Sequence, residues 1–407
     1  MHHITIIVGG GQAGAEVATS LRQQGYKGRV LLVGEEPYLP YRRPPLSKTY
    51  LAGETGAEGL LIKPAATYEK AGTELLVPLK VQSVDRAAHR ILLSDGREQH
   101  YDKLVLATGG RPRRLTLPGA GASNILYLRT LDDIDAIRKE FRPDRRLVIV
   151  GGGYIGLEIA SVAIKHGLNV TVLESAPRVL ARVTSPKMSA FYERVHREAG
   201  VDLRTNVKLQ GFEQVADRAV AALLDDGTRI DLDFVVAGIG LLPNVELAEA
   251  AGLEVTDGIV VDKYARSSDP DILAAGDCAN HPSAWAGRRL RLESVPNAME
   301  QARTVAATIC GKLQPYNSVP WFWSDQYDLK LQMVGLCGGY DEVVVRGRPA
   351  ENSFCMFYLR GGVIIAAETV NRSSEFMVAK RLVAQGVQAR AEDLSDEEQP
   401  LLAMVAA

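Results

Sequence analysis

Two glycine-rich stretches carry the residues of this sequence whose spacing most clearly predicts chemistry. The first is Gly9-x-Gly11-x-x-Gly14, between the apolar run "ITIIV" and a segment of helical composition. Its glycines permit a tight turn, close approach of the backbone to a pyrophosphate, and close packing of helix on strand. The helix start that follows offers free N–H groups and a positive dipole end to phosphates. Glu35, 21 residues after Gly14, can accept ribose hydroxyls, so this stretch predicts a dinucleotide site.

The second stretch repeats the first. "RLVIVGGGYIGLEIASVAIKHG" contains Gly151-x-Gly153-x-x-Gly156, and Glu174 follows 18 residues later at the end of "NVTVLE". A single fingerprint is weak evidence, because glycine turns before helices are common. Two copies, each between a strand and a helix and each with a spaced acid, are specific for nucleotide binding.

The duplication extends beyond the loops and predicts the elements that position them. Residues 91–110 and 222–240 share one plan: a strand, an Asp-Gly turn, a second strand, and a buried strand that ends in glycines. The stretch "SSDPDILAAGDCAN" then reads as a strand ending at Gly276-Asp277. We expect this strand to return to the first unit and to bring Asp277 beside its ligand. The fold class is therefore α/β, with two Rossmann-like dinucleotide-binding units.

Composition excludes several other classes of protein. The chain has 407 residues, 46% apolar and 24% charged, with a net charge of −2, so nothing predicts nucleic-acid or membrane binding. The four cysteines are at least 18 positions apart, and the histidines are scattered, which argues against a metal or iron–sulfur site and against a disulfide framework. No apolar run has membrane-spanning length and no signal peptide is evident, so we expect a cytoplasmic protein.

Motifs along almost the whole chain resemble a known family. They include "PPLSK", "LVLATGGRPR", "GGGYIGLE", "AGIGLLPN", "ESVPNAMEQAR", "PWFWSDQY" and "TVNR". The chain resembles flavoprotein reductases whose first unit holds FAD and whose second holds NAD(P)H, with glutathione-reductase-like architecture. It is most similar to the ferredoxin reductases that serve Rieske oxygenases and bacterial cytochrome monooxygenases. The resemblance implies a discontinuous FAD domain (1–111 and 243–316), an NAD domain (112–242) and an α+β C-terminal domain (317–407).

The resemblance also implies which residues contact FAD. They are Gly9, Gly11, Ala13, Gly14, Glu35, Lys48, Val81, Ala107, Thr108, Gly109, Arg129, Asp277 and Val295. Lys48 would lie near flavin N5, and its alternative is a solvated helix lysine. Asp277 could instead cap a helix, and Arg129 could pair with Asp132 or Asp133. Val295 precedes Pro296 and a segment of helical composition, "PNAMEQARTVAATIC", at whose start a backbone N–H could favour negative charge on the flavin; the alternative for Val295 is core packing.

A second set of residues is expected at the nicotinamide nucleotide. It comprises Gly151, Gly153, Ile155, Gly156, Glu174, Arg182 and Gly240. A carboxylate at Glu174 should accept ribose hydroxyls and repel a 2′-phosphate, which predicts a preference for NADH that Arg178 and Arg182 could soften. Glu158 is either close to the nicotinamide or a structural helix residue. Trp323 is implied near the flavin, with core packing as the alternative.

Residues 38–51 decide where the electrons go. Disulfide reductases of this fold carry a cysteine pair there, but "YLPYRRPPLSKTYL" contains no sulfur. The flavin must therefore reduce an external acceptor, and the resemblance implies a [2Fe–2S] ferredoxin. Candidate docking residues are Arg288, Arg303 and Lys330, with Arg289 and Arg291 nearby; the alternative is a scatter of solvated charges. Rubredoxin, oxygen or a quinone as acceptor, or an NADH-sensing signalling role, stay open, as does a monomer or weak dimer.

Overall fold

The chain forms two compact units in the computed structural model, which describes residues 3–405. Unit 1 contains the residues up to Arg42, Ala57–Arg111 and Leu242–Phe322. Unit 2 contains Arg43–Gly56, Pro112–Leu241 and the residues from Trp323 onward. The short strands β8 (Gly110–Pro112) and β17 (Leu241–Pro243) lie where the chain passes from one unit to the other. The finer three-domain division stays a prediction.

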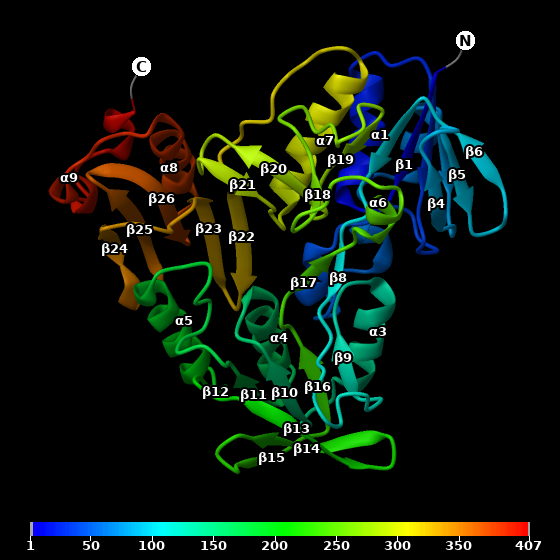
Figure 1. Ribbon diagram of the computed structural model, residues 1–407. Coiled ribbons are helices and arrows are strands. Elements are labelled where there is room, and N and C mark those ends of the chain that lie inside the picture. Colours follow the sequence, from blue (N-terminus) through cyan, green and yellow to red (C-terminus); the bar gives the residue numbers. More distant parts are fainter. Residues whose placement is uncertain (1–2, 406–407) are drawn as a thin grey trace. The chain divides into compact units, whose positions relative to one another are not determined.

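A parallel sheet is the centre of unit 1 (Figure 1). Its strand order is β19-β7-β1-β2-β3, formed by Ile272–Ala274, Lys103–Leu106, Ile4–Val8, Arg29–Val33 and Thr73–Leu76, and every pairing is parallel. Runs such as "ITIIV" and "RVLLV" suit strands that are buried on both faces. Strand β19 pairs with β7, which confirms that the chain returns to the first unit before Asp277.

Helices and smaller sheets cover the strands of unit 1. Helices α1 (Gln12–Gln23) and α7 (Val295–Ile309) share one apolar core in which Val17, Leu21 and Val305 are fully buried. An antiparallel sheet of β4 (Val81–Asp85), β5 (Arg90–Leu93) and β6 (Glu98–His100) confirms the hairpin predicted before β7. The remaining elements are η2 (Ala57–Leu60), α2 (Ala65–Lys70), α6 (Glu246–Ala250), β18 (Ile259–Val260), β20 (Ala279–Ser283) and β21 (Arg288–Leu290).

Unit 2 repeats the parallel sheet. Its order is β12-β11-β10-β16-β9, formed by Asp202–Arg204, Asn169–Leu173, Arg146–Val150, Phe234–Ala237 and Ile125–Tyr127. Helices α3 (Leu131–Glu140), α4 (Tyr154–Lys165) and α5 (Pro186–Glu198) accompany it, with the antiparallel strands β13 (Leu209–Val215), β14 (Arg218–Leu224) and β15 (Arg229–Asp231). In both sheets the strand before the glycine loop is central, which places the loop at the carboxyl edge of the sheet.

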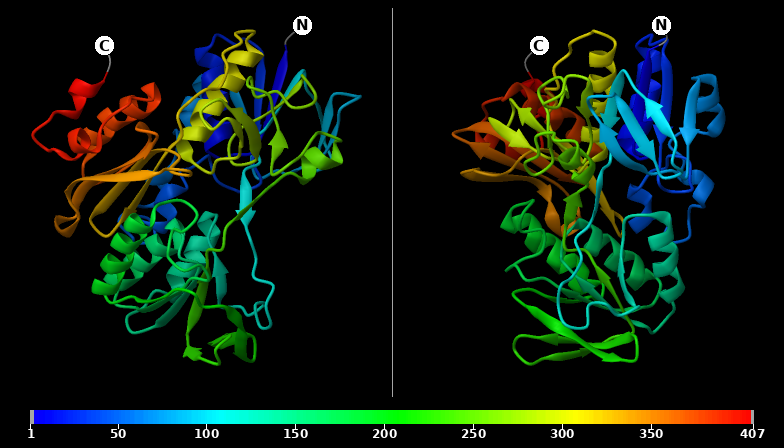
Figure 2. Two further views of the ribbon diagram at one scale, coloured as in Figure 1. Left: turned by 60° about the vertical axis from the view of Figure 1, so that its left-hand side comes forward. Right: turned by 45° about the vertical axis from the view of Figure 1, so that its right-hand side comes forward.

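The C-terminal part of unit 2 contains a further sheet. Its order is β22-β23-β26-β25-β24, formed by Trp321–Gln326, Leu329–Gly335, Val363–Val370, Ser353–Arg360 and Glu342–Arg348. Strands β25 and β26 form the hairpin predicted at Gly361-Gly362. Helix α8 (Ser373–Gln385) packs on β26 and β23, and Figure 2 shows it, in red, on one face of the sheet. The short elements η1 (Pro44–Ser47), η3 (Pro349–Glu351), α9 (Ala391–Ser395) and η4 (Leu401–Met404) complete the unit.

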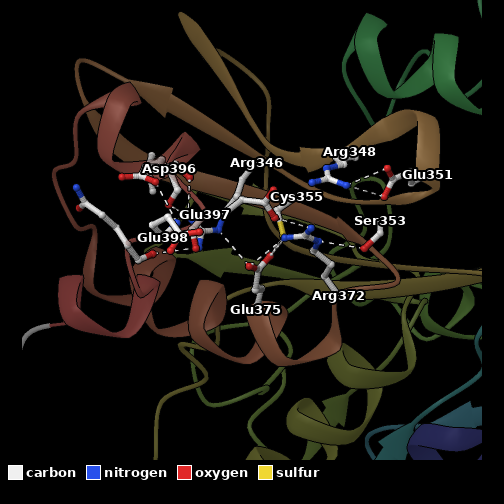
Figure 3. Close-up of polar contacts among 12 residues, drawn as sticks. Arg346, Arg348, Glu351, Ser353, Cys355, Arg372, Glu375, Asp396, Glu397 and Glu398 are labelled. Carbon is white, nitrogen blue, oxygen red and sulfur yellow. Dashed lines mark hydrogen bonds and ion pairs between the residues drawn. The ribbon is translucent and has the colours of Figure 1, made fainter.

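The acidic C-terminal segment is held by one buried arginine, Arg346 on β24 (Figure 3). Its guanidinium donates to the Glu375 carboxylate and to four backbone carbonyls, those of Leu394, Asp396, Glu397 and Gln399. The arginine therefore binds the main chain of this segment, whose carboxylates are largely exposed. None of the helices within residues 3–405 is long and apolar enough to cross a membrane.

Candidate functional site

The first glycine loop, in unit 1, has the geometry of a phosphate cradle. Gly9 has φ +121°, and a Cβ placed on it would lie 2.1 Å from the carbonyl oxygen of Ala107. A Cβ on Gly14 would lie 2.0 Å from the carbonyl oxygen of Gly9. A Cβ on Gly11, by contrast, meets nothing within 4 Å, and no side chain caps the helix that begins there. Two glycines are thus required by the fold, and the third leaves room for a ligand that approaches the free N–H groups.

Other predicted FAD residues of unit 1 lie around this loop. A Cβ on Gly276 would lie 3.1 Å from the Cβ of Ala13, so Asp277 follows directly beside the start of α1. No helix begins at Asp277, because the chain continues into β20, and the helix-cap alternative is wrong. Thr108 donates its hydroxyl to the carbonyl of Asn244 over 2.6 Å. The helix predicted from Pro296 is α7, which begins one residue earlier at Val295 with Ser294 as the cap.

Glu35 is the acid of the first loop, and it is exposed. Its carboxylate pairs with Lys80 Nζ at 3.1 Å, and both side chains are more than half exposed. Lys80 immediately precedes Val81, another predicted FAD residue, which is buried at the start of β4. The carboxylate is therefore accessible to a ligand and is held only by a solvated ion pair.

The second glycine loop, in unit 2, repeats the cradle. Gly151 has φ +110°, and a Cβ on it would lie 2.5 Å from the carbonyl oxygen of Gly238; the corresponding distance from Gly156 to the carbonyl oxygen of Gly151 is 2.2 Å. A Cβ on Gly153 meets nothing within 4 Å, and helix α4 has no side-chain cap. Gly240 also lies in open space, with φ +113°.

The acid of the second loop is fixed by the backbone. Glu174 Oε2 accepts from the N–H of Gly152 and Oε1 accepts from the N–H of Ala176, each over 2.7 Å. Of the two nearby arginines, Arg178 donates to Ser189 Oγ and to the carbonyl of Ala181, so its guanidinium is engaged within the protein. Arg182 is exposed, as is Ile155 at 47%.

Lys48 and Glu158 form a buried ion pair within unit 2. Lys48 Nζ lies 2.9 Å from Glu158 Oε2, and the two side chains are 14% and 3% exposed. The interpretation of Lys48 as a solvated helix lysine is therefore wrong. Ser47 donates to the same carboxylate oxygen over 2.5 Å, and Ser324 donates to Glu158 Oε1 over 2.6 Å. One cation and two hydroxyls thus offset the cost of burying this carboxylate.

Trp323 and Ser324 lie on opposite faces of β22, because side chains alternate along a strand. Trp323 is half-buried, and Ser324 is fully buried against Glu158. Ser47 and Ser324 were missed in the sequence interpretation. No local pattern could have found them, since "WFWSDQ" is three large residues followed by three polar ones, and only the structure shows that Ser324 and Gln326 share a buried face.

Arg129 belongs to unit 2, where its N–H and that of Thr130 both donate to Asp133 Oδ2. Thr130 and Asp133 form a capping box at the start of α3. Asp133 therefore contacts the backbone of Arg129, and Asp132 and Asp133 together supply the acidic first turn that a helix dipole favours.

The candidate docking arginines are engaged to different degrees. Arg289 donates to backbone carbonyls of Val261 and Asn280, and Arg291 pairs with Asp257 and Glu293. These two have structural roles. Arg303 pairs with Glu16 but stays 55% exposed. Arg288 and Lys330 are exposed.

The cysteines are free and none lies in residues 38–51. Cys278 and Cys355 are buried, and burial raises the pKa of each thiol, so neither is a ready thiolate. No group of three or more potential metal ligands occurs among the residues that the structure describes.

Known families and proteins are similar to this chain along nearly its whole length. Residues 3–302 match the pyridine nucleotide-disulphide oxidoreductase family, and residues 321–405 match the reductase C-terminal family. The chain is 49% identical to putidaredoxin reductase of Pseudomonas putida, over 99% of this chain and 96% of that protein. It is 45% identical to the ferredoxin reductase subunit of 5,5'-dehydrodivanillate O-demethylase from a Sphingobium species, over 100% and 99% of the two chains. The solved covalent putidaredoxin reductase–putidaredoxin complex matches with a TM-score of 0.96, covering 99% of this chain and 98% of that one.

Proposed function

Because the chain belongs to the pyridine nucleotide-disulphide oxidoreductase family and carries a reductase C-terminal domain, we propose that it is an NADH-dependent, FAD-containing ferredoxin reductase. Its acceptor is a [2Fe–2S] ferredoxin that serves a cytochrome monooxygenase or a Rieske oxygenase. The relatives named above include ferredoxin reductases of oxygenase systems, which supports this acceptor. Four free cysteines suit a reducing compartment, and the proposal includes a cytoplasmic location.

One observation carries the choice of an external acceptor. The segment that holds a cysteine pair in disulfide reductases instead brings Lys48 to the buried carboxylate of Glu158. A lysine cannot accept electrons. Electrons must therefore leave the protein without passing through sulfur of this segment.

FAD is assigned to the loop of unit 1 and NADH to the loop of unit 2. The free N–H groups after Gly11 and after Gly153 would bind the two pyrophosphates, and Glu35 and Glu174 would bind adenosine ribose hydroxyls. When bound, FAD supplies the conversion of a two-electron hydride donor into single electrons. The dinucleotide sites have no competing side chain at either helix start, which supports both assignments.

Lys48 and Glu158 would act as a pair. The ammonium group of Lys48 supplies a positive charge suited to a reduced, anionic ring system. Glu158 fixes that ammonium at 2.9 Å and, by charge neutralisation, permits a lysine that is only 14% exposed. Trp323, on the other face of β22, would cover the flavin or shape the approach of the partner.

The proposed function is tested by separating two electron acceptors. With FAD bound, NADH should reduce ferricyanide with the enzyme alone, whereas reduction of cytochrome c should require an added [2Fe–2S] ferredoxin. Cytochrome c reduction that is equally fast without ferredoxin, or that needs rubredoxin, would contradict the choice of acceptor. Very slow turnover with every acceptor would favour an NADH-sensing role.

Docking through basic residues is tested by charge reversal. Arg303 is a poor choice, because a glutamate there would lie beside Glu16. Lys330→Glu should lower the ferredoxin-coupled rate at low salt and weaken its dependence on ionic strength, with ferricyanide reduction unchanged. Lys187→Glu, at another exposed lysine of unit 2, is the matched control. Equal effects of the two variants would place the docking surface elsewhere.

A further inference from the structure

Glu158 is the end of a longer chain of hydrogen bonds within unit 2. Ser324, which donates to Glu158 Oε1, accepts from Gln326 Nε2 over 3.3 Å. Gln326 Oε1 lies 2.8 Å from His196 Nε2, and His196 Nδ1 lies 3.0 Å from the hydroxyl of Tyr327. We call Ser324, Gln326, His196 and Tyr327 the Glu158 array.

The contacts are satisfied when every hydrogen bond in this array is donated in the same direction along it. Ser324 gives its proton to the carboxylate, so its oxygen is free to accept from the amide of Gln326. The amide oxygen then needs a donor, which makes His196 the neutral Nε2–H tautomer. Its Nδ1 is left as an acceptor for Tyr327. Every donor points toward Glu158, and the bonds polarise one another in the sense that strengthens the donation from Ser324 to Glu158 Oε1.

Burial makes the array a strong constraint. Ser324 and His196 are 0% exposed and Gln326 is 1% exposed, so water cannot replace a lost partner. Burial also lowers the pKa of His196 to about 4, so the ring is neutral at physiological pH, as the array requires. An orphaned polar group in this environment is costly.

Tyr327 shows a second, independent sign of constraint. It lies in the turn between β22 and β23 with φ +57°, a conformation that favours glycine and is unusual for an aromatic residue. Its ring packs on His196 with centroids 5.1 Å apart, and its carbonyl accepts from Lys165 Nζ over 3.3 Å. These contacts hold Tyr327 in its unfavourable backbone conformation, in which its hydroxyl reaches His196 Nδ1.

We infer that the Glu158 array fixes the Glu158 carboxylate in one orientation, and that His196 is a remote positioning residue for the Lys48–Glu158 pair. The inference rests on the proposed function, because it gives a purpose to the array only if Glu158 acts at the nicotinamide and flavin. Oε1 is held by the array and Oε2 by Ser47 and Lys48, so the two sides of the carboxylate are fixed by different elements.

Several charged or titratable groups face this region. Lys48 of η1 contacts Glu158 directly, and Tyr192 of α5 lies within electrostatic reach of it. Burial, together with the charges of Glu368, Asp325 and Glu158, raises the pKa of Tyr192, which therefore stays neutral. Only Lys48 among these groups supplies a positive charge to the carboxylate.

The first experiment measures kcat and KM for NADH separately, with ferricyanide as acceptor. Ser324→Ala should lower kcat by about tenfold with a much smaller change in KM, because Glu158 loses a charge-assisted hydrogen bond that fixes its orientation. Gln326→Met and His196→Leu should lower kcat by less, and Tyr327→Phe least. His196→Gln should restore kcat, since an amide can donate from a similar position. Ser161→Ala is the matched control, because Ser161 is a buried serine bonded to the backbone carbonyl of Glu158.

A second readout does not depend on turnover. The buried His281, whose pKa burial also lowers to about 4, should be neutral at pH about 5 in every variant. Long-range ¹H–¹⁵N spectra of the FAD-bound enzyme with ¹⁵N-labelled histidine should show a second neutral ring at that pH, of the Nε2–H form, that vanishes in His196→Gln. Glu158→Gln should shift the nitrogen resonances of that ring, and Ser161→Ala should not. An Nδ1–H tautomer would reverse the donors and overturn the inference, even if a variant fails to fold.

The variant Glu158→Gln distinguishes a failure of the proposed role of Glu158 from a failure of the positioning role of the array. In that background, Ser324→Ala and Gln326→Met should cause no further change in kcat or KM. If Glu158→Gln itself leaves kcat and KM unchanged, the proposed role of Glu158 fails. If Glu158→Gln changes them but Ser324→Ala and Gln326→Met behave like Ser161→Ala, the array has no positioning role and only the further inference fails.

Discussion

The two glycine loops have nearly the same backbone geometry and hold their acids in opposite ways. In both loops the outer glycines would clash with a carbonyl oxygen if they carried a Cβ, while the middle glycine faces open space. Glu35 of the first loop is exposed and paired only with the exposed Lys80. Glu174 of the second loop accepts two backbone N–H groups, one of them from the loop itself at Gly152.

This difference shows that a shared fingerprint fixes the pyrophosphate cradle without fixing the recognition of the ribose. In the first loop, the fold does not depend on the carboxylate of Glu35. In the second loop, the carboxylate of Glu174 that would bind the ribose is also a structural part of the loop. Specificity and stability are therefore coupled at Glu174 and separate at Glu35.

The largest expected effect comes from the outer glycines. Gly14→Ala and Gly156→Ala should each cost more than about 3 kcal/mol of stability, because the new Cβ would lie 2.0 or 2.2 Å from a carbonyl oxygen. Urea unfolding measures the loss. A large loss of stability in one variant and none in the other would contradict the conclusion that the two loops have the same backbone geometry.

The middle glycines supply the control for that experiment. Gly11→Ala and Gly153→Ala should leave the urea midpoint almost unchanged, since nothing lies within 4 Å of the added Cβ. Gly11→Ala should lower FAD content, measured by absorbance, and Gly153→Ala should weaken NADH binding. A retained affinity in both variants would mean that the pyrophosphates do not approach these positions.

Buried titratable groups of both units should make the stability of the chain depend on pH. His281 of unit 1 is buried, and burial lowers its pKa to about 4. An unfolded histidine takes up a proton first, so the contribution of His281 to stability is complete above its unfolded pKa and is lost as pH falls toward 4. His196 of unit 2 acts in the same direction.

Glu368 of unit 2 should act in the opposite direction. Burial raises its pKa to about 7, against hydrogen bonds from Thr184 and Tyr358 that lower it. Because the folded state retains the proton longer, stability is full below the unfolded pKa and falls as pH rises toward 7, by about 3 kcal/mol at most. Glu368→Gln should therefore raise stability at pH about 8 relative to pH about 5, in urea titrations of the whole chain. An unchanged pH slope would show that Glu368 is ionised throughout.

The acids of the two loops provide the sharpest comparison. Glu174→Ala should cost about 1 to 3 kcal/mol, since two N–H groups lose their acceptor, and should reduce the preference for NADH over NADPH. Glu35→Ala should cost less than about 1 kcal/mol, because an exposed ion pair contributes little. Unfolding midpoints and kcat/KM for both nucleotides measure these effects, and equal stability losses would remove the distinction drawn between the loops.

The smallest effect is expected at Lys80. Lys80→Ala should change stability by less than about 0.5 kcal/mol and FAD affinity only slightly, because its side chain is 61% exposed. A large loss of FAD would indicate that Lys80, rather than leaving Glu35 accessible, orients it for the ribose.

Local features of the sequence predicted the parts of the site that are local in the chain. Each glycine loop, its helix and its acid lie within some thirty residues, and strand–turn–helix geometry follows from spacing. The return of β19 to the first sheet was also predictable, since "DILAAGD" repeats the pattern of a buried strand that ends in glycine. The resemblance of the motifs added the identity of the nucleotides.

The state of each polar side chain could not be predicted in this way. From its residue type alone Lys48 could be a solvated helix lysine, and the scattered histidines predicted only that no metal site is formed, yet Lys48 is paired in the interior and His196 is a link between strand and helix. The burial and the hydrogen bonds of Lys48 and His196 depend on partners 110 or more positions away in the chain. The spacing of residues in the sequence does not predict such contacts.

The sequence by itself determined that this protein has two dinucleotide cradles, an acid after each, and no cysteine where a disulfide relay would lie. These properties follow from steric rules that act over a few residues. Only the tertiary structure decided that Glu158 receives donors from Lys48, Ser47 and Ser324, and that Glu174 is fixed while Glu35 is not. The reason is physical: a carboxylate in water needs no particular partner, whereas a buried carboxylate is stable only beside donors that folding brings together from distant segments.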